Sequence, residues 1–487
     1  LNIVMDIRNL NPVRVWTHFY SLTQIPRPSK KEEKAIEFLL NFGKELGLET
    51  IKDEIGNVII KKPASAGMEN RQGIIFQAHI DMVPQKNSDK VHDFEKDPIV
   101  PRIVDGWVYA TGTTLGADNG LGIAVAMAVL EDKDMVHGPI EALFTVDEEA
   151  GMNGARGLKP GLLDGDILIN LDSEDEGELY VGCAGGLDTN VVFKYNSVAA
   201  PQGDSYELRV TGLKGGHSGM DIILGRGNAN KILVRVLLPM LKELGVELAS
   251  IDGGSLRNAI PREAFAKVVI PSSNVEAAKS LIESHLTDIK AELVAHEPTV
   301  SIELVPCEKQ DSVIEKAVAL NVIKSVYACP NGVERMSDAM PGLVETSNNL
   351  AIVKSDNGVI EIKTLMRSSV DSAKDILAQS IASVFELAGA EVTFSGGYPG
   401  WKPNVNSAIL KTMKSVYKDM FGKEPEVKAI HAGLECGILG GPYPHWDMIS
   451  CGPTIRSPHS PDERVEIDTV EKWWNYVVEV LKNAPVK

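Results

Sequence analysis

Apolar residues recur along the chain in two patterns that predict different elements. Short, almost uninterrupted apolar runs occur at 73–79, 140–146 and 166–171, and each becomes polar at its end. Such runs are typical of strands buried on both faces of a sheet. Longer segments with helical spacing occur at 30–48 and 115–132. Strands that alternate with helices predict an α/β fold, with a mostly parallel sheet sandwiched by helices.

Small residues mark the expected ends of these helices. Ser29 is expected to cap the first helix and Gly47 to end it. Gly116 and Gly120 bracket Asp118, which predicts a turn directly ahead of the second helix.

The chain changes character near residue 186. From there to about residue 395, strands with polar alternation and two long helices are expected, and polar strand ends of the earlier kind return only afterwards. We therefore predict a discontinuous catalytic domain made of residues 1–186 and 396–487. Residues 187–395 would form an inserted α+β domain that serves as a lid or in dimerisation.

The predicted insert contains two similar segments. Residues 268–281 and 364–377 both run from an apolar strand through a Ser-Ser turn into a helix. An internal duplication explains this similarity. Strand–turn–helix units also commonly use serine at the turn, so both explanations stay open.

Composition excludes several classes of protein. The 487 residues exceed one ordinary core, which predicts two domains. The formal net charge of -18 argues against nucleic-acid binding. No apolar run is long enough to cross a membrane, and residues 1–10 lack the pattern of a secretory leader. The five cysteines form no paired motif, which is typical of reduced thiols in a cytoplasmic protein.

Histidines and acids stand at the ends of the predicted strands and in turns near them. Because the carboxyl ends of parallel strands meet at one edge of a sheet, these side chains are expected to gather there. Their nitrogen and oxygen atoms suffice for two zinc-like ions. The sequence therefore predicts a hydrolase with a paired metal centre, and the candidate residues are His79, Asp81, Asp118, Glu148, Glu149, Asp172 and His459.

Each of these motifs alone has an ordinary structural explanation. HID at a strand end is commonly a solvated turn, DEE a charged loop, GADNG a good turn and PHSPDE a proline-rich loop. The combination favours the metal centre, because the ordinary explanation must account for every motif falling at an expected place.

Taken together, QAHID, GADNG, DEEAG, NLDSED, GGHSG and SPHSPDE resemble the motifs of the co-catalytic zinc metallopeptidase family that includes aminoacylases, glutamate carboxypeptidases and dipeptidases. The resemblance covers essentially the whole chain. Within the family, LDSEDEGELYVGCAGG and GGHSGMDIILGRGNANK are most similar to the subgroup that cleaves Xaa-His dipeptides.

The resemblance implies a role for each metal-type residue. His79 and Asp172 would hold one Zn²⁺, Glu149 and His459 would hold the other, and Asp118 would bridge the two. Mn²⁺ or Co²⁺ can occupy such oxygen-rich sites as well. In the same family pattern, the general base on a metal-bridged water would be Glu148, and the residue that orients the His79 imidazole would be Asp81.

Residues outside these motifs would contact the substrate. The resemblance makes His217 a donor to the oxyanion, from its own subunit or from a second one, and places Asn258 and Arg367 at the substrate. Arg367 would grip the substrate carboxylate with two parallel hydrogen bonds. GLKGGHSG lacks the ending of a phosphate-binding loop, so that interpretation is rejected. In the glycine-rich segment 431–441, Glu435 would face the substrate's amino group or imidazole, although an ordinary tight turn explains the segment as well.

The expected activity is metal-dependent hydrolysis of unblocked dipeptides, preferably Xaa-His dipeptides including β-alanyl-histidine. A homodimer is expected, with no nucleic-acid or membrane partner. Another amidohydrolase of the same family, such as a tripeptidase, a broad dipeptidase or a deacetylase, is the nearest alternative. A silent metal-binding protein is disfavoured by the intact Glu148. A mainly structural protein does not explain why acids and histidines cluster at strand ends.

Overall fold

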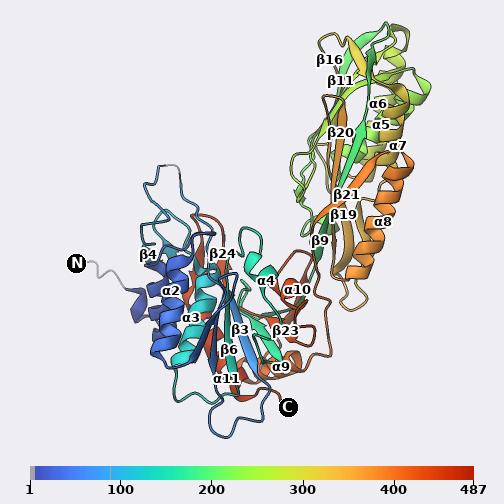
Figure 1. Cartoon of the computed structure of the whole chain (residues 1–487). Coiled ribbons are helices and arrows are strands. Elements are labelled where there is room, and N and C mark those ends of the chain that lie inside the picture. The colour runs from blue at the N-terminus through green and yellow to red at the C-terminus, as the bar shows by residue number, and fades with distance from the viewer. Residues whose placement is uncertain (1–5, 88) are drawn as a thin grey trace. The chain divides into compact units, whose positions relative to one another are not determined.

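The computed structural model describes residues 6–87 and 89–487, which form two compact units (Figure 1). Unit 1 comprises Leu1–Gly182, Pro403–Ala429 and Leu434–Lys487, and unit 2 comprises Cys183–Lys402 and Ile430–Gly433. The prediction about a secretory leader falls partly on residues 1–5, which lie outside the described residues. Within the described ranges, every helix is too short or too polar to cross a membrane.

Unit 1 is built around an eight-stranded sheet with a smaller sheet beside it. The large sheet has the order β1 (Glu49–Lys52), β2 (Val58–Lys62), β6 (Ile140–Thr145), β3 (Ile74–His79), β7 (Ile167–Asn170), β23 (Asp447–Ser450), β8 (Glu178–Cys183) and β22 (Glu426–Ile430). The small sheet has the order β24 (Ile455–Arg456), β25 (Arg464–Glu466), β5 (Trp107–Ala110) and β4 (Pro101–Val104). The helical elements are η1 (Ile7–Asn9), α1 (Val13–Thr23), α2 (Glu33–Glu45), α3 (Ala117–Glu131), α4 (Asn153–Gly157), α9 (Ala408–Phe421), α10 (Glu435–Leu439) and α11 (Ile467–Lys482).

The centre of the large sheet is parallel. Strand β3 pairs in parallel with β6 and β7, and β23 pairs in parallel with β7. Every residue of β3, β6 and β7 is buried, as their apolar sequences predict. The pairs β1–β2, β2–β6 and β23–β8 are antiparallel, so the sheet is mixed around its parallel centre. The predicted α/β class is confirmed.

The first predicted helix begins later than expected. Helix α2 starts at Glu33, and the prediction that Ser29 caps it is wrong. The Ser29 hydroxyl instead donates a hydrogen bond of 2.7 Å to Oδ2 of Asp81. A polar residue before an apolar repeat can thus bond a distant carboxylate rather than the helix. The other end agrees with the prediction, because the helix stops before Gly47, whose φ of 71° is left-handed.

Unit 2 is an antiparallel sheet with helices packed against it. The order along the main path is β16 (Ser301–Pro306), β11 (Asp204–Thr211), β15 (Ala264–Ile270), β13 (Glu247–Gly253), β19 (Val344–Asp356), β20 (Val359–Ser368), β9 (Gly185–Lys194) and β21 (Glu391–Tyr398), and β18 (Gly332–Met336) also pairs with β19. Two short pairs join β10 (Ser197–Ala199) to β17 (Ser312–Ile314) and β12 (Gly216–His217) to β14 (Ala259–Ile260). The helical elements are η2 (Ile222–Leu224), α5 (Ala229–Glu243), η3 (Ser272–Asn274), α6 (Val275–Glu292), α7 (Lys316–Ala328) and α8 (Asp371–Leu387).

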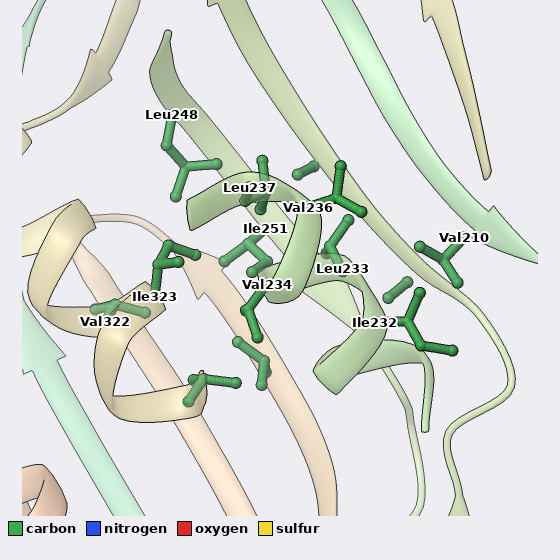
Figure 2. Close-up of a cluster of buried hydrophobic side chains, with 14 of the residues drawn as sticks. Val210, Ile232, Leu233, Val234, Val236, Leu237, Leu248, Ile251, Val322 and Ile323 are labelled. Atoms are coloured by element: carbon green, nitrogen blue, oxygen red, sulfur yellow. The ribbon is translucent and has the colours of Figure 1, made fainter. Parts of the chain in front are cut away.

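The core of unit 2 forms where helix α5 meets the sheet and helix α7. Figure 2 shows Leu233 and Leu237 of α5 among apolar side chains from the strands and from α7. Val210, Ile251 and Val322 belong to the same cluster and are fully or almost fully buried. The helices and the sheet therefore share one hydrophobic core. Burying one such side chain contributes about 1.5–3 kcal/mol to the free energy of folding.

The sheet of unit 2 has a mirrored strand order. Apart from the short elements, residues 204–306 form β11, α5, β13, β15, α6 and β16, and the segments on either side form the corresponding set β9, α7, β19, β20, α8 and β21. Across the sheet, β16-β11-β15-β13 is followed by β19-β20-β9-β21, in which each strand has its counterpart in reverse order. The two sets meet where β13 pairs antiparallel with β19.

Candidate metal centre

Metal-type side chains gather at the carboxyl ends of the parallel strands of unit 1. His79 is the last residue of β3, Glu148 and Glu149 follow β6, and Asp172 follows β7. Asp118 lies at the start of α3, after a left-handed turn at Gly116. His459 comes from the loop between β24 and β25. Elements that are far apart in the sequence therefore contribute to one edge of the sheet.

Asp118 lies between the two histidines. Its Oδ1 is 3.0 Å from Nε2 of His79, and its Oδ2 is 3.2 Å from Nε2 of His459. Oδ1 of Asp172 is 3.5 Å from the same nitrogen of His79, and Oε1 of Glu149 is 3.0 Å from Nε2 of His459. The two oxygens of one carboxylate thus face two imidazoles, each of which has a second carboxylate beside it.

These side chains form two sets that share Asp118. One set is His79, Asp118 and Asp172, the other is Asp118, Glu149 and His459, and in each the potential ligand atoms lie within 4.8 Å of one another. Each set offers one imidazole nitrogen and two carboxylate oxygens, which suits zinc and leaves room for a further ligand. The chemistry of the donor set therefore fits a metal pair.

Burial and hydrogen bonding move the pKa values of these residues in opposite directions. Burial raises the pKa of Asp172 to about 7, and repulsion from Asp118 adds to the effect. Burial also acts to raise the pKa of Asp118, but hydrogen bonds from His459 and His79 prevail and hold it well below its usual range. Hydrogen bonds to Asp118 and Glu149 raise the pKa of His459 to about 11. Protons therefore compete with a metal for these atoms, because a ligating imidazole must be neutral.

Asp81 is fully buried and contacts both the His79 ring and the neighbouring loop. Nδ1 of His79 lies 3.1 Å from the Asp81 carbonyl oxygen and 3.3 Å from Oδ1. A proton on Nδ1 leaves Nε2 free for a metal. The Asp81 carboxylate also accepts the backbone N–H groups of Glu148 at 2.9 Å and of Glu149 at 3.1 Å. Asp81 thus holds the ring and the acidic loop together.

Glu148 lies close to these sets with a strongly shifted pKa. Its Oε2 is 4.0 Å from Nε2 of His79, and one cluster of possible ligands joins His79, Glu148 and Glu149. Burial raises the pKa of Glu148 well above its usual range. A buried carboxylate with a raised pKa accepts a proton more readily than an exposed one, as a general base must.

The substrate-type residues of unit 2 are connected through Ser218. The Ser218 backbone N–H donates to the Asn258 carbonyl oxygen at 2.8 Å, and the guanidinium of Arg367 donates to the Ser218 hydroxyl at 3.2 Å. Arg367 is 5% exposed and also donates to the Tyr398 hydroxyl at 3.3 Å. The structure therefore brings Asn258, Arg367 and the strand of His217 together within this unit.

His217 is held in one tautomer. Its Nδ1 accepts the backbone N–H groups of Gly219 at 3.1 Å and Met220 at 3.0 Å. Burial and the nearby Arg367 lower the pKa of His217. The neutral ring therefore carries its proton on Nε2, which makes that atom a hydrogen-bond donor.

Comparison with known proteins identifies the family. The model of peptidase family M20/M25/M40 matches residues 75–483. The chain belongs to this family. M20 enzymes are metallopeptidases with a metal cofactor that is typically zinc, which confirms the resemblance drawn from the motifs.

Individual relatives of this M20 peptidase cover it almost completely. It is 47% identical over 489 residues to the cytosol non-specific dipeptidase of Escherichia coli (strain K12), with 99% of this chain and 100% of the relative covered. The crystal structure of an aminoacylhistidine dipeptidase from Vibrio alginolyticus matches with a TM-score of 0.96 and 48% identity, covering 99% of each chain. A tripeptidase from Staphylococcus aureus has a TM-score of 0.56 at 18% identity, covers 97% of this chain and 98% of its own, and shares the fold.

Glu435 has a different environment from the other candidate residues of this M20 peptidase. It begins helix α10 and is 2% exposed. Its Oε2 accepts hydrogen bonds from Gln77 at 2.6 Å and from Thr145 at 3.0 Å, while the described residues offer no partner to its Oε1. Burial raises the pKa of Glu435 to about 7. One oxygen is thus bonded to the strands β3 and β6.

Sequence reasoning missed several buried charged residues of the M20 centre. Glu32 is 5% exposed, and its Oε1 accepts the backbone N–H of Asp147 at 2.8 Å, directly before the acidic loop. Arg27 and Glu463 of the same unit are also buried. Glu32 follows two lysines in a charged run and resembles a solvated helix start, so the sequence carried no signal for it.

Proposed function

We propose that this M20 peptidase hydrolyses unblocked dipeptides, preferably those with a C-terminal histidine, including β-alanyl-histidine. The observation that carries the proposal is the position of Asp118 between His79 and His459. Relatives that cover the whole chain are described as a non-specific dipeptidase and an aminoacylhistidine dipeptidase, which supports the substrate class. The first relative's name also supports a cytoplasmic location for this chain.

Two Zn²⁺ ions per subunit are proposed, or Mn²⁺ or Co²⁺ in their place. His79 and Asp172 would hold one ion and Glu149 and His459 the other, with Asp118 shared between them. When bound, the metal pair polarises the peptide carbonyl and acidifies water. Asp81 keeps Nε2 of His79 directed at the site through its contact with Nδ1.

Glu148 is proposed as the general base. It takes a proton from the attacking water as the C–O bond forms, and it delivers that proton to the amine nitrogen as the C–N bond breaks. Its raised pKa favours holding the proton between these two events. Its backbone is fixed by the hydrogen bond to Asp81, so the carboxylate starts from a defined position.

The residues of unit 2 would bind the substrate. His217 would donate its Nε2 proton to the oxyanion, and the support for this is the acceptor role of its Nδ1. Arg367 would grip the C-terminal carboxylate with two parallel hydrogen bonds, and Asn258 would contact the same dipeptide. In unit 1, Oε1 of Glu435 would face the substrate's amino group or imidazole, since the described residues leave it without a partner.

We also infer that the insert, proposed as residues 187–395, is a duplicated lid that takes part in dimerisation. The mirrored strand order supports duplication, because each half contains the same strand–helix succession. A duplicated insert can complete the site within one chain, whereas an insert without the duplication would need the His217 of a second subunit.

An exposed apolar group in unit 2 supports a homodimer. Element η2 contacts strand β18, and these two elements and Met220, just before η2, carry apolar side chains that are at least 39% exposed. We name this group the η2–β18 patch, and its members are Met220, Ile223, Leu224, Val333 and Met336. Exposed apolar patches on globular proteins often mark interaction sites, and a second copy of the chain is the occupant proposed here.

The test of the proposed function is hydrolysis by metal-free protein that is reloaded with graded zinc. The substrates are β-alanyl-histidine, Xaa-His and Xaa-Leu dipeptides, an N-acetylated dipeptide and a tripeptide. Cleavage confined to unblocked dipeptides, fastest with C-terminal histidine and dependent on added metal, is the expected result. Metal-dependent cleavage of the tripeptide or the acetylated substrate instead would show that the proposed substrate class is wrong. The absence of any hydrolysis with metal bound would refute the proposed activity.

A further inference from the structure

The turn that carries Asp118 is held by a buried carboxylate from the other end of the chain. Glu463 is 2% exposed and lies directly before strand β25. Its Oε2 accepts the backbone N–H groups of Leu115 at 2.7 Å and Gly116 at 3.0 Å. Its Oε1 accepts the backbone N–H of Asp118 at 3.2 Å. One side chain thus satisfies three amide groups of a single turn.

Arg27 holds the same turn from its carbonyl side. This guanidinium is 1% exposed, and its Nη2 donates to the Gly116 carbonyl oxygen at 2.6 Å. Its Nη1 donates to the Ile80 carbonyl oxygen at 2.8 Å, directly after His79. A Cβ on Gly116 would lie only 2.6 Å from Nη2 of Arg27. The turn is therefore enclosed tightly and joined to the segment that follows β3.

The position of Glu463 also couples two of the proposed ligands. It lies four residues after His459 in SPHSPDE, so the segment that brings His459 to Asp118 also brings the carboxylate that orients the Asp118 turn. Asp118 must keep one oxygen on each imidazole, and a rotation of its turn would change both distances. Removing the Glu463 carboxylate would leave buried amide groups without acceptors, which favours such a change.

We propose that Glu463 is a positioning residue for the metal pair, which acts by fixing the turn of Asp118. The inference rests on the proposed function for the identity of the ligands. It concerns a side chain that contacts backbone amides rather than substrate or metal. Partners of this kind around metal ligands typically account for a factor of about 10–100 in metal affinity.

The experiment measures metal binding by metal-free protein rather than activity. Glu463→Ala and Glu463→Gln are titrated with Co²⁺ and with Zn²⁺, and the visible spectrum of the Co²⁺ form is recorded. The matched control is Glu141→Gln. Glu141 is buried and accepts the backbone N–H groups of Asp164 and Gly165, but it lies near the start of β6, at the opposite end from the acidic loop.

The expected result is that Glu463→Ala binds at least one ion about 10–100-fold more weakly and has an altered Co²⁺ spectrum. Glu463→Gln should be intermediate, because a carboxamide keeps one acceptor oxygen. Glu141→Gln should keep the parent affinity and spectrum even where its unfolding midpoint falls.

Parent affinity and spectrum in the Glu463 variants would overturn the inference, and so would an equal loss in Glu141→Gln. Should Glu463→Ala not fold, the Gln variant decides by the same criteria. Failure of the dipeptidase activity is detected separately, since parent protein that binds both ions without cleaving dipeptides leaves the titration valid. Parent protein that binds no ion refutes both proposals.

Discussion

At the scale of single residues, the two oxygens of Asp118 have different partners. Oδ1 faces His79 and Oδ2 faces His459, and each histidine has its own additional carboxylate. Glu148 is the acid at this edge that lies farther from the imidazoles, at 4.0 Å from His79. Because Glu148 also lies in one set of possible ligands with His79 and Glu149, the separation of the proposed base from the proposed ligands stays a prediction.

Replacing Glu148 tests this separation. Glu148→Ala should retain both metals, because it removes no proposed ligand, while kcat should fall by a factor on the order of 10²–10⁴. Metal content by elemental analysis and kcat on β-alanyl-histidine give the two readings. Retained turnover would refute the assignment, and loss of metal together with turnover would make Glu148 a ligand.

His431 is a second residue whose environment has a measurable consequence. It is buried in unit 2, with Nε2 at 2.7 Å from the Ser347 hydroxyl. Burial, followed by the nearby Arg367 and His217, lowers the pKa of His431 to about 3. The folded chain thus keeps this ring neutral at pH values where the unfolded chain, with an ordinary pKa of about 6.5, is protonated.

Because the unfolded state binds the extra proton, the stability of unit 2 should fall as pH falls from about 6.5 toward 3. Between pH 7 and pH 5, His431 should account for about 2 kcal/mol of this loss. Urea unfolding of the parent and of His431→Asn at both pH values measures it. The variant should lose less stability than the parent over this range, and equal losses would contradict the neutral, buried ring.

At the scale of elements, the apolar pattern decides most of the fold. The central strands and helix α3 lie where the apolar runs and the helical segment predict them, and α5 and α8 lie in the insert, where long helices are expected. Ser29 is the exception, because its hydroxyl donates a hydrogen bond of 2.7 Å to Asp81, which is distant in the sequence, instead of capping the helix. Local patterns thus locate an element better than they locate its cap.

Substitutions in helix α5 should lower the free energy of unfolding only on its buried face. Leu237 is fully buried in the core of unit 2, so Leu237→Ala should cost about 2–5 kcal/mol of unfolding free energy. Lys242 is exposed on the same helix, and Lys242→Ala should change stability by less than about 0.5 kcal/mol. Denaturant unfolding compares the two variants, and similar effects would contradict the packing of this helix.

At the scale of the whole molecule, the proposed homodimer depends on the η2–β18 patch. Ile223→Glu combined with Leu224→Glu should convert the dimer into a monomer, because burying two carboxylates in an apolar interface is costly. Leu387→Glu is the control, since Leu387 is 91% exposed in the same unit but lies outside the patch. Sedimentation velocity reads the outcome, and a monomeric parent or a dimeric double variant would rule out this interface.

The sequence by itself determined the α/β class, the central strands and the residues that stand at their ends. The elements can be read locally, because the side chains that an element buries recur at a fixed spacing in the sequence. The residues at the strand ends follow from them, because the carboxyl ends of parallel strands meet at a common edge. His79, Glu148, Glu149 and Asp172 could therefore be named from the strand ends before their distances were known, whereas the turn and loop motifs of Asp118 and His459 needed the combination of all the motifs.

Only the tertiary structure decided how the chain holds those residues. Asp118 and Glu463 are 345 residues apart, and Glu32 lies 115 residues from the amide that it binds. Bonds from a buried carboxylate to backbone N–H groups leave no mark on the sequence of the turn they hold, because every residue except proline offers the same amide. The same reason explains why Arg27, which binds carbonyl oxygens, emerged from the fold alone.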